Sequence, residues 1–490
     1  MDLVDILPVL MFVALGLLLF SGYPVAFVLA GVGLGFGVIG IALDAFAWVQ
    51  FGSIPSRIFG GMAENLILTA IPMFILMGTV LERSGIARDL LNCLLVLLRR
   101  VPGGLALSVT LMGTIMAATT GIIGASVVMM TLLALPVMVQ RNYDLPLATG
   151  TIAASGTLGI LIPPSIMLVI MSDLLARSVG NMFVAALFPG LLLSALYVIY
   201  IVVLSMLNPQ RAPLPDRDFG PATAAGIWKM IARSFIPPLL LIFLVLGSIL
   251  FGVATPTEAA GVGAAGAIML AFVNLVMLPA FGVGRHEFGQ PGSPGEAMDG
   301  GPSGEGVLTD AVHFAGVIWQ SAACSAQTNA MLFAIFIGAT VFSYVFRSLG
   351  GDGLVIDFVE GLGLGSWGLL ILLMALIFVL GFFFDWIEIT LIVLPVFAPI
   401  ISSLDFGAHV DKAEVVYWFA ILMAVNLQTS FLTPPFGFAL FYMKAVAPRG
   451  VKIEHIYKGI IPFVVLQLTG LGLVIAFPEI ALWLPRVLLD

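Results

Sequence analysis

Ser155-Gly-Thr-Leu-Gly-Ile-Leu-Ile-Pro-Pro-Ser165 interrupts an apolar run in the first half of the chain, and Asn426-Leu-Gln-Thr-Ser-Phe-Leu-Thr-Pro-Pro-Phe-Gly437 interrupts one in the second half. Each stretch contains two adjacent prolines, which lack the N–H donor that a continuous helix needs. Inside hydrocarbon no water satisfies unwound backbone, so a break persists only where it lines a protein cavity or holds a ligand. The two stretches therefore predict two broken helices at a binding site.

The composition indicates that these runs lie in a membrane. The chain of 490 residues is 61% hydrophobic and 9% charged, whereas a soluble domain has about 45–50% and about 25%. Its mean hydropathy is +1.16. So few charges could not cover a water-soluble globule, and an outer-membrane barrel would show alternating segments of about ten residues. The chain is predicted to be an all-α polytopic membrane protein, and its net charge of −8, mostly from loops, does not suggest nucleic-acid binding.

Three paired segments indicate an internal repeat. Besides the two stretches above, Gly22–Gly33 and Gly252–Gly263 both end in Ala-Gly-Val-Gly, and Thr119–Pro136 aligns with Phe378–Pro395. All three matches occur in the same order. The chain is therefore predicted to be duplicated, with halves at about 1–205 and 235–490.

The first half is predicted to contain five crossings and one re-entrant hairpin. The expected elements are spans at Leu3–Phe20, Pro24–Leu43, Leu66–Leu81 and Ser178–Leu207, interfacial arms at Ala45–Gly60 and Ile86–Arg100, a hairpin of Gly104–Thr119 and Val127–Val139, and a broken helix at Leu145–Leu175. The two hairpin segments are too short for a core of about 30 Å, which needs about 20 residues. Five is odd, so the second half should enter the membrane upside down, as an inverted repeat.

Basic residues favour an outward N-terminus. In that orientation only Arg57, Arg177, Arg347, Lys412 and Arg486 lie outside, which leaves 14 of the 19 Lys and Arg residues on the cytoplasmic side. Cytoplasmic loops normally carry this excess. Both termini are therefore predicted to be periplasmic. Met1-Asp-Leu-Val-Asp lacks the basic start of a signal peptide, so the first span should be retained.

These elements divide the chain into scaffold and transport segments. The scaffold is predicted at 1–102, 177–234, 235–363 and 449–490, and the transport elements, each a hairpin plus a broken helix, at 103–176 and 364–448. The Gly/Pro-rich acidic segment 279–315 is predicted to be a flexible cytoplasmic insert, for which a tolerated loop is favoured over a regulatory role.

The breaks offer the oxygen atoms that an alkali cation prefers. The hairpin tips are expected at Thr119–Ser126 and Gly381–Glu388. Unwound carbonyls, hydroxyls and helix C-terminal ends suit Na+, and helix N-termini attract an anion. The candidate Na+ residues are Thr120, Gly121, Gly124, Ser126, Ser155, Gly156, Thr157, Pro163, Gly381, Asp385, Asn426, Gln428, Thr429, Ser430 and Thr433. The candidate substrate residues are Thr119, Ser165, Thr433 and Gly437.

Asp385 is the most informative single residue, because an ionisable group within an apolar run indicates function by default. It is interpreted as a cation ligand, a proton-coupling carboxylate or a helix N-cap, and these roles can coexist. Its counterpart in the first half is Ser126. Glu258 lies just after a predicted helix start. Stabilisation of the helix dipole explains its position as well as a role in binding does.

Some other groups are weaker candidates, or argue against chemistry altogether. Arg177, Arg347 and Lys444 are interpreted as membrane-end anchors, or alternatively as contacts to an anion. Cys93 and Cys324 are far apart in apolar surroundings, so neither a disulfide nor a metal site is expected. The four histidines lie in the insert or near loops, and the chain has no HExxH motif and no GxxxxGK[ST] loop. An enzyme is therefore not expected.

A gated ion channel is the stronger alternative to a transporter, although paired breaks favour alternating access over an open pore.

Five phrases resemble the large permease subunit (DctM) of tripartite ATP-independent periplasmic (TRAP) transporters. They are Gly22-Tyr-Pro-Val-Ala, Gly252-Val-Ala-Thr-Pro-Thr-Glu-Ala-Ala260, Ala118-Thr-Thr-Gly-Ile-Ile-Gly-Ala-Ser126, Gly159-Ile-Leu-Ile-Pro-Pro-Ser165 and Leu432-Thr-Pro-Pro-Phe-Gly437. The resemblance covers nearly the whole chain; only the insert departs from it.

The resemblance implies an elevator-type secondary importer, coupled to Na+, in a bacterial inner membrane. Its partners would be a small four-helix membrane subunit and a periplasmic binding protein that delivers an organic anion, commonly a carboxylate. The family's cation sites correspond to Ser126, Gly121, Ser155, Gly156, Asp385, Thr429 and Thr433. Coupling to H+ through Asp385 is the alternative within transport.

Overall fold

The computed structural model describes residues 3–120, 123–214, 223–280, 307–434 and 437–489. Within these ranges the chain is helical and contains no strand, which confirms the all-α prediction. Nine of the described helical segments are long and apolar enough to cross a membrane, by length and composition.

Helices of the first repeat precede residue 208. They are α1 (Leu3–Leu19), α2 (Val25–Ala42), α3 (Trp48–Phe51), α4 (Ser53–Ile58), α5 (Ala70–Arg83), α6 (Ile86–Leu97), α7 (Gly104–Thr120), α8 (Ile123–Gln140), α9 (Leu145–Thr157), α10 (Ile166–Leu174) and α11 (Val179–Leu207).

Helices of the second repeat follow in a similar order. They are α12 (Ala224–Met230), α13 (Ile236–Leu250), α14 (Pro256–Phe272), α15 (Leu278–Ala280), α16 (Val307–Ser348), α17 (Gly351–Gly361), α18 (Ser366–Leu380), α19 (Trp386–Ser403), α20 (Val415–Leu432), α21 (Phe438–Val446), α22 (Ile453–Ala476) and α23 (Glu479–Leu489). The order hairpin, broken helix, long helix thus occurs twice, as α7–α11 and as α18–α22. One difference is α16, a single helix of 42 residues where the first repeat has the separate pieces α3, α4 and α5.

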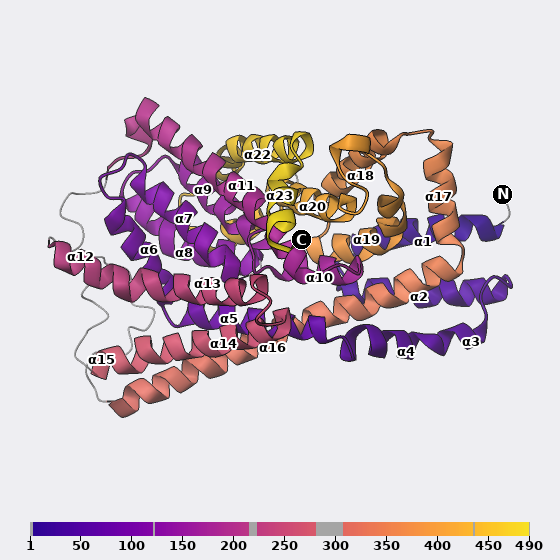
Figure 1. The fold of residues 1–490 in the computed structure, drawn as a ribbon, viewed down its shortest axis with the longest axis horizontal. Coiled ribbons are helices and arrows are strands. Elements are labelled where there is room, and N and C mark those ends of the chain that lie inside the picture. Colours follow the sequence, from indigo (N-terminus) through magenta and orange to yellow (C-terminus); the bar gives the residue numbers. More distant parts are fainter. Residues whose placement is uncertain (1–2, 121–122, 215–222, 281–306, 435–436, 490) are drawn as a thin grey trace.

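One group of helices joins the two repeats through close backbone contacts. α2 packs on the C-terminal half of α16, and α14 packs on α5. A Cβ atom on Gly33 would lie 3.1 Å from the backbone of Phe342, and one on Gly263 would lie 2.8 Å from the sulfur of Met77. Glycine at these positions therefore lets the helices approach closely, as is common in membrane proteins. In Figure 1, α2 and α16 lie side by side along the lower part of the molecule.

A second group of helices surrounds the breaks. α9 packs against α22, where a Cβ atom on either Gly150 or Gly459 would clash with the backbone of the other helix. Thr114 on α7 and Ser194 on α11 share a hydrogen bond of 2.7 Å. These contacts join α11 and α22 to the hairpins and broken helices, whereas the sequence predicts residues 177–234 and 449–490 to be scaffold.

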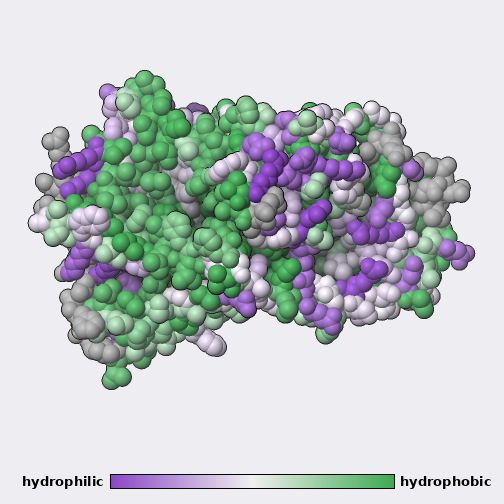
Figure 2. Space-filling model, in the orientation of Figure 1, coloured by the Kyte–Doolittle hydropathy of each residue, from purple (hydrophilic) through white to green (hydrophobic). Residues whose placement is uncertain are grey.

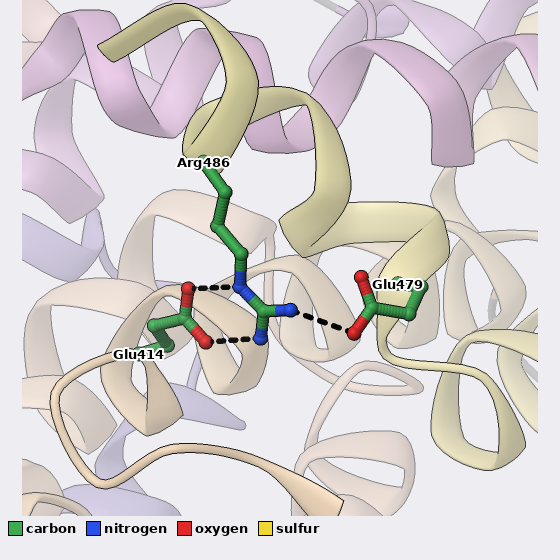
Figure 3. Close-up of polar contacts among 3 residues, drawn as sticks. All are labelled: Glu414, Glu479 and Arg486. Carbon is green, nitrogen blue, oxygen red and sulfur yellow. Dashed lines mark hydrogen bonds and ion pairs between the residues drawn. The ribbon is translucent and has the colours of Figure 1, made fainter. Parts of the chain in front are cut away.

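The C-terminal helix is held to α20 by a charged cluster (Figure 3). Arg486 on α23 donates from Nε to Glu414 at 2.7 Å and from a terminal nitrogen to the second oxygen of the same carboxylate at 2.5 Å. Its other terminal nitrogen donates to Glu479 at 2.7 Å. Paired, charge-assisted bonds of this kind fix both distance and orientation. They also raise the pKa of Arg486 above its ordinary value, so the guanidinium stays charged.

Hydrophobic residues cover much of the surface. Figure 2 shows them over the part of this face formed by α5, α11 and α13, with hydrophilic residues at the adjoining end and across the opposite half. A large exposed apolar surface indicates contact with lipid or with another membrane protein.

We expect the contact between α9 and α22 to tolerate no side chain at Gly459. The Gly459→Ala variant should lower the free energy of unfolding by about 1–3 kcal/mol, because its Cβ would overlap Pro146. Gly472→Ala is the matched control on the same helix, since nothing lies within 4 Å of its Cβ position. Alanine there should be neutral, or stabilising by up to about 1 kcal/mol. Thermal unfolding of the purified protein measures both, and equal stability of the two variants would contradict the packing described.

Candidate functional site

The first hairpin is more helical than the sequence suggested. α7 continues to Thr120 and α8 begins at Ile123. The expected unwound tip Thr119–Ser126 is therefore wrong at both ends, because Thr119 and Thr120 are still helical and Gly124 and Ser126 lie in the first turns of α8. Thr119 and Thr120 end α7, and Gly121 lies outside the described residues.

Packing against α9 explains this longer helix. A Cβ atom on Gly156 would lie 2.5 Å from the side chain of Val127, and Ile123, Ser126 and Val127 are buried. α8 has 18 residues and is itself long enough to cross. The helix expected at Val127–Val139 was therefore too short.

The first broken helix is present, but its break begins after Thr157 and not at Ser155 as predicted. α9 ends at Thr157, a 3-10 turn covers Leu158–Ile160, and α10 begins at Ile166. The hydroxyl of Ser165 donates to the carbonyl of Ile160 at 2.6 Å and so satisfies one unwound backbone group. Pro163 lies within the break. Ser155, Gly156 and Thr157 belong to the last turn of α9, and all three are buried.

Unwound backbone forms the second hairpin tip, as predicted. α18 ends at Leu380 and α19 begins at Trp386. The carboxylate of Asp385 accepts from the backbone N–H of Trp386 at 2.8 Å. Glu388 in turn accepts from the N–H of Asp385 at 3.2 Å. Asp385 is therefore the N-cap of α19 in a capping box.

The second break is narrower than predicted. α20 remains helical to Leu432, so Asn426–Leu432 is not unwound, and Asn426, Gln428, Thr429 and Ser430 lie inside the helix. Thr429 and Ser430 donate to carbonyls one turn earlier, at 3.3 and 2.8 Å, which lets a polar segment stay helical. Asn426 donates to the carbonyl of Met374 on α18 at 2.7 Å.

The break itself begins at Thr433. Its hydroxyl donates to the carbonyl of Thr429 at 2.8 Å. Gly437, with a positive φ of 42°, precedes α21, and such a backbone angle favours glycine. Residues 435 and 436 lie outside the described ranges.

Hairpins and breaks from both repeats meet. A Cβ atom on Gly381 would overlap the side chain of Ser430, so the second tip contacts α20. α20 also contacts α9 and the turn that follows it. α8 packs on α21, and α10 packs on α19, so each hairpin touches the broken helix of the opposite repeat.

Tyr442 connects three of these elements, although nothing in the sequence marks it as a site residue. A Cβ atom on Gly124 of α8 would lie 3.0 Å from the tyrosine ring, so the ring packs directly on that helix. Asp385 and Glu388 at the start of α19 are near enough to interact with it electrostatically. No local sequence pattern distinguishes this tyrosine. Only the fold, which places α21 beside the two hairpins, shows its position.

Two candidate residues have polar atoms available for a ligand. Gln428 is fully buried, and within the described ranges neither atom of its side-chain amide has a hydrogen-bond partner. Asp385 uses its carboxylate for backbone N–H groups, although a carboxylate has about four lone-pair positions. Both groups are therefore suited to coordinate a cation.

The remaining charged candidates have separate explanations. Glu258 accepts from the N–H and the hydroxyl of Thr255, both at 2.8 Å, so it caps α14. Lys444 donates to the carbonyl of Val451 at 2.7 Å. Arg177 and Arg347, by contrast, line one cavity of about 490 Å³.

Removing the side chain of Asp385 should expose its capping role. Asp385→Ala should lower the free energy of unfolding by about 1 kcal/mol. Asp385→Asn should leave the free energy of unfolding unchanged, because asparagine is an equally good N-cap. Thr255→Ala is the positive control, since it removes the equivalent acceptor from α14. Thermal unfolding measures all three, and an asparagine variant as unstable as the alanine variant would contradict this role.

Comparison with known proteins places the chain in a family. It is 29% identical over 424 residues to the C4-dicarboxylate TRAP transporter large permease protein DctM of Pseudomonas aeruginosa, covering 86% of this chain and 87% of that one. It is 28% identical to the isethionate TRAP transporter permease protein DctMQ of Oleidesulfovibrio alaskensis, covering 98% of this chain and 67% of that one.

A solved structure shares the fold. The YdaH transporter of Alcanivorax borkumensis, described as having an unusual topology, superposes with a TM-score of 0.59 at 13% identity over 90% of both chains. The family described as the tripartite ATP-independent periplasmic transporter, DctM component, matches residues 12–480. The chain therefore belongs to the TRAP transporter large permease family, which consists of multi-pass transport proteins of the bacterial inner membrane and not of enzymes.

Proposed function

We propose that this permease imports a small organic anion together with Na+. The observation that carries the proposal is the packing of each hairpin on the broken helix of the opposite repeat, together with the available oxygen atoms of Asp385 and Gln428. Carboxylate, amide and hydroxyl oxygens are the ligands that hard cations prefer in proteins. The anion would be held by helix N-termini at the same breaks.

The transported compound is proposed here as a chemical class and not as a single substance. The relatives named above differ in substrate, one being a C4-dicarboxylate and the other isethionate. Both are small organic anions, which supports that class for this chain. In the family a periplasmic binding protein delivers the substrate and a small membrane subunit assists. A neighbouring gene for a binding protein would identify the cargo to assay.

The exposed apolar surface of the chain offers a place for the small subunit. This chain spans 67% of the DctMQ relative, so that relative contains an additional segment. We propose that a separate four-helix subunit packs on the group formed by α2, α5, α14 and α16, and that both termini of the permease face the periplasm.

For movement we propose an elevator, in which the elements around the breaks slide against α2, α5, α14 and α16. The moving body would contain residues 103–207 and 364–489. This adds α11, α22 and α23 to the segments expected from sequence, because α11 and α22 pack on the broken helices and α23 packs on α11. The links at Val101–Gly104 and Gly361–Gly365 would be the hinges. Each contains a glycine with positive φ, Gly103 at 72° and Gly363 at 60°.

Uptake should depend sigmoidally on external Na+, because each break pair would bind one ion. Proteoliposomes with both partner proteins and the cargo measure it. Asp385→Asn should raise the half-saturating Na+ concentration about tenfold, equivalent to about 1.4 kcal/mol, while thermal stability stays the same. Uptake that followed a pH gradient and ignored Na+ would instead support H+ coupling through Asp385.

A cross-link between the two bodies should stop uptake. Asn65, just before α5, donates to Asp173 on α10 at 2.6 Å, so cysteines at 65 and 173 should be bridged by a short bifunctional thiol reagent. The matched control bridges positions 83 and 320, because Arg83 and Gln320 make contact within the fixed body at 3.4 Å.

Cys93→Ala and Cys324→Ala provide the background for both pairs. The first cross-link should abolish uptake and the second should leave it unchanged. Undiminished flux through the first would reject the elevator and favour a gated channel.

A further inference from the structure

The cavity between the two bodies contains two arginines that no described role explains. It has a volume of about 490 Å³ and is lined by Asp173 and Arg177 at the end of α10, Arg347 at the end of α16, Pro395 and Ser402 on α19, and Val416 on α20. α16 belongs to the proposed fixed body, and the other elements belong to the moving one.

Arg177 is the freer of the two cations. Its guanidinium lies 5.9 Å from the ring centre of Tyr417, and its side chain is exposed. Among the described residues it has no ion-pair partner. An anchor that reached for a membrane surface would not need to line a cavity, so anchoring alone does not explain its position.

Arg347 makes one hydrogen bond and one weak ion pair among the described residues. It donates to the backbone carbonyl of Pro395 and lies 3.7 Å from Asp352, with 45% of its side chain exposed. At that distance Asp352 makes an exposed ion pair worth little. Most of its five N–H donors remain available.

The acidic group in the cavity is already occupied. Asp173 accepts from the side-chain amide of Asn65 at 2.6 Å, and this bond orients the carboxylate towards α5. Two arginines and one engaged carboxylate therefore line the cavity. Guanidinium groups bind carboxylates through paired hydrogen bonds, and the volume is within the range of about 300–1,000 Å³ typical of small-molecule sites.

We propose that this cavity is a second binding site for a small organic anion, a carboxylate or a sulfonate, held between Arg177 and Arg347. The proposal rests on the function proposed above, because the anion is of the transported class. In the expected orientation the cavity opens to the periplasm, so it would bind the cargo before the breaks do. An anion held by both arginines would also connect the fixed and the moving body.

Chemical protection tests the site without requiring transport. The wild-type chain in phosphatidylcholine nanodiscs, free of Na+, is treated with phenylglyoxal, which modifies arginine, and mass spectrometry follows each residue. Succinate and isethionate are the probes, and succinamide is the neutral control. At twice its dissociation constant, a probe should slow modification of Arg177 and Arg347 about threefold. Arg449, exposed in the loop before α22, should react at an unchanged rate.

Two results would overturn the site. One is that neither probe protects Arg177 and Arg347, and the other is that Arg449 is protected equally. Direct binding of labelled probe to the Arg177→Gln, Arg347→Gln double variant should be lost, and Lys412→Gln, which removes one exposed charge outside the cavity, should bind normally. Na+-driven uptake without protection would refute this site alone, whereas protection without any uptake would refute the proposed function alone.

Discussion

Backbone hydrogen bonding in hydrocarbon is the constraint on which the centre of this protein depends. Each interruption of a helix leaves N–H and C=O groups that lipid cannot satisfy. The chain satisfies several with its own side chains. Ser165 bonds across the first break, Asp385 and Glu388 cap α19, and Thr433 bonds back into α20. The breaks are stable only when protein surrounds them, and so the interrupted elements of both repeats pack against one another.

That requirement separates the helices into two groups with different contacts. Around the breaks, glycines permit backbone contact, as between Gly150 and Gly459, and buried polar pairs such as Tyr197 with Gln467 cross between α11 and α22. Such contacts make a closely packed group. Among the described residues, side-chain hydrogen bonds from Asn65 to Asp173 and from Arg347 to Pro395 join this group to α16 and to the residues before α5. α5 also packs on α7, and α16 on α19, so the boundary between the groups is packed mainly through apolar contacts.

The positions of the breaks could be predicted because their causes are local. Paired prolines and an acidic residue in an apolar run are visible in the sequence itself. Their extent could not be, since Thr429 and Ser430 read as break residues until their hydroxyls are seen to bond within the helix. The grouping of α11 and α22 and the position of Tyr442 depend on contacts between distant segments. Likewise, Arg177 and Arg347 are 170 positions apart, and only the fold places both at one cavity.

The capping box of Asp385 sharpens the case for a bound cation. A helix N-cap needs only an acceptor, and serine, threonine or asparagine provides one without a charge. Thr255 does so at α14. An ionised carboxylate in an apolar run carries a large desolvation cost that a hydroxyl does not. Capping therefore explains an acceptor at position 385 but not its charge, whereas a cation bound at the tip would offset that cost.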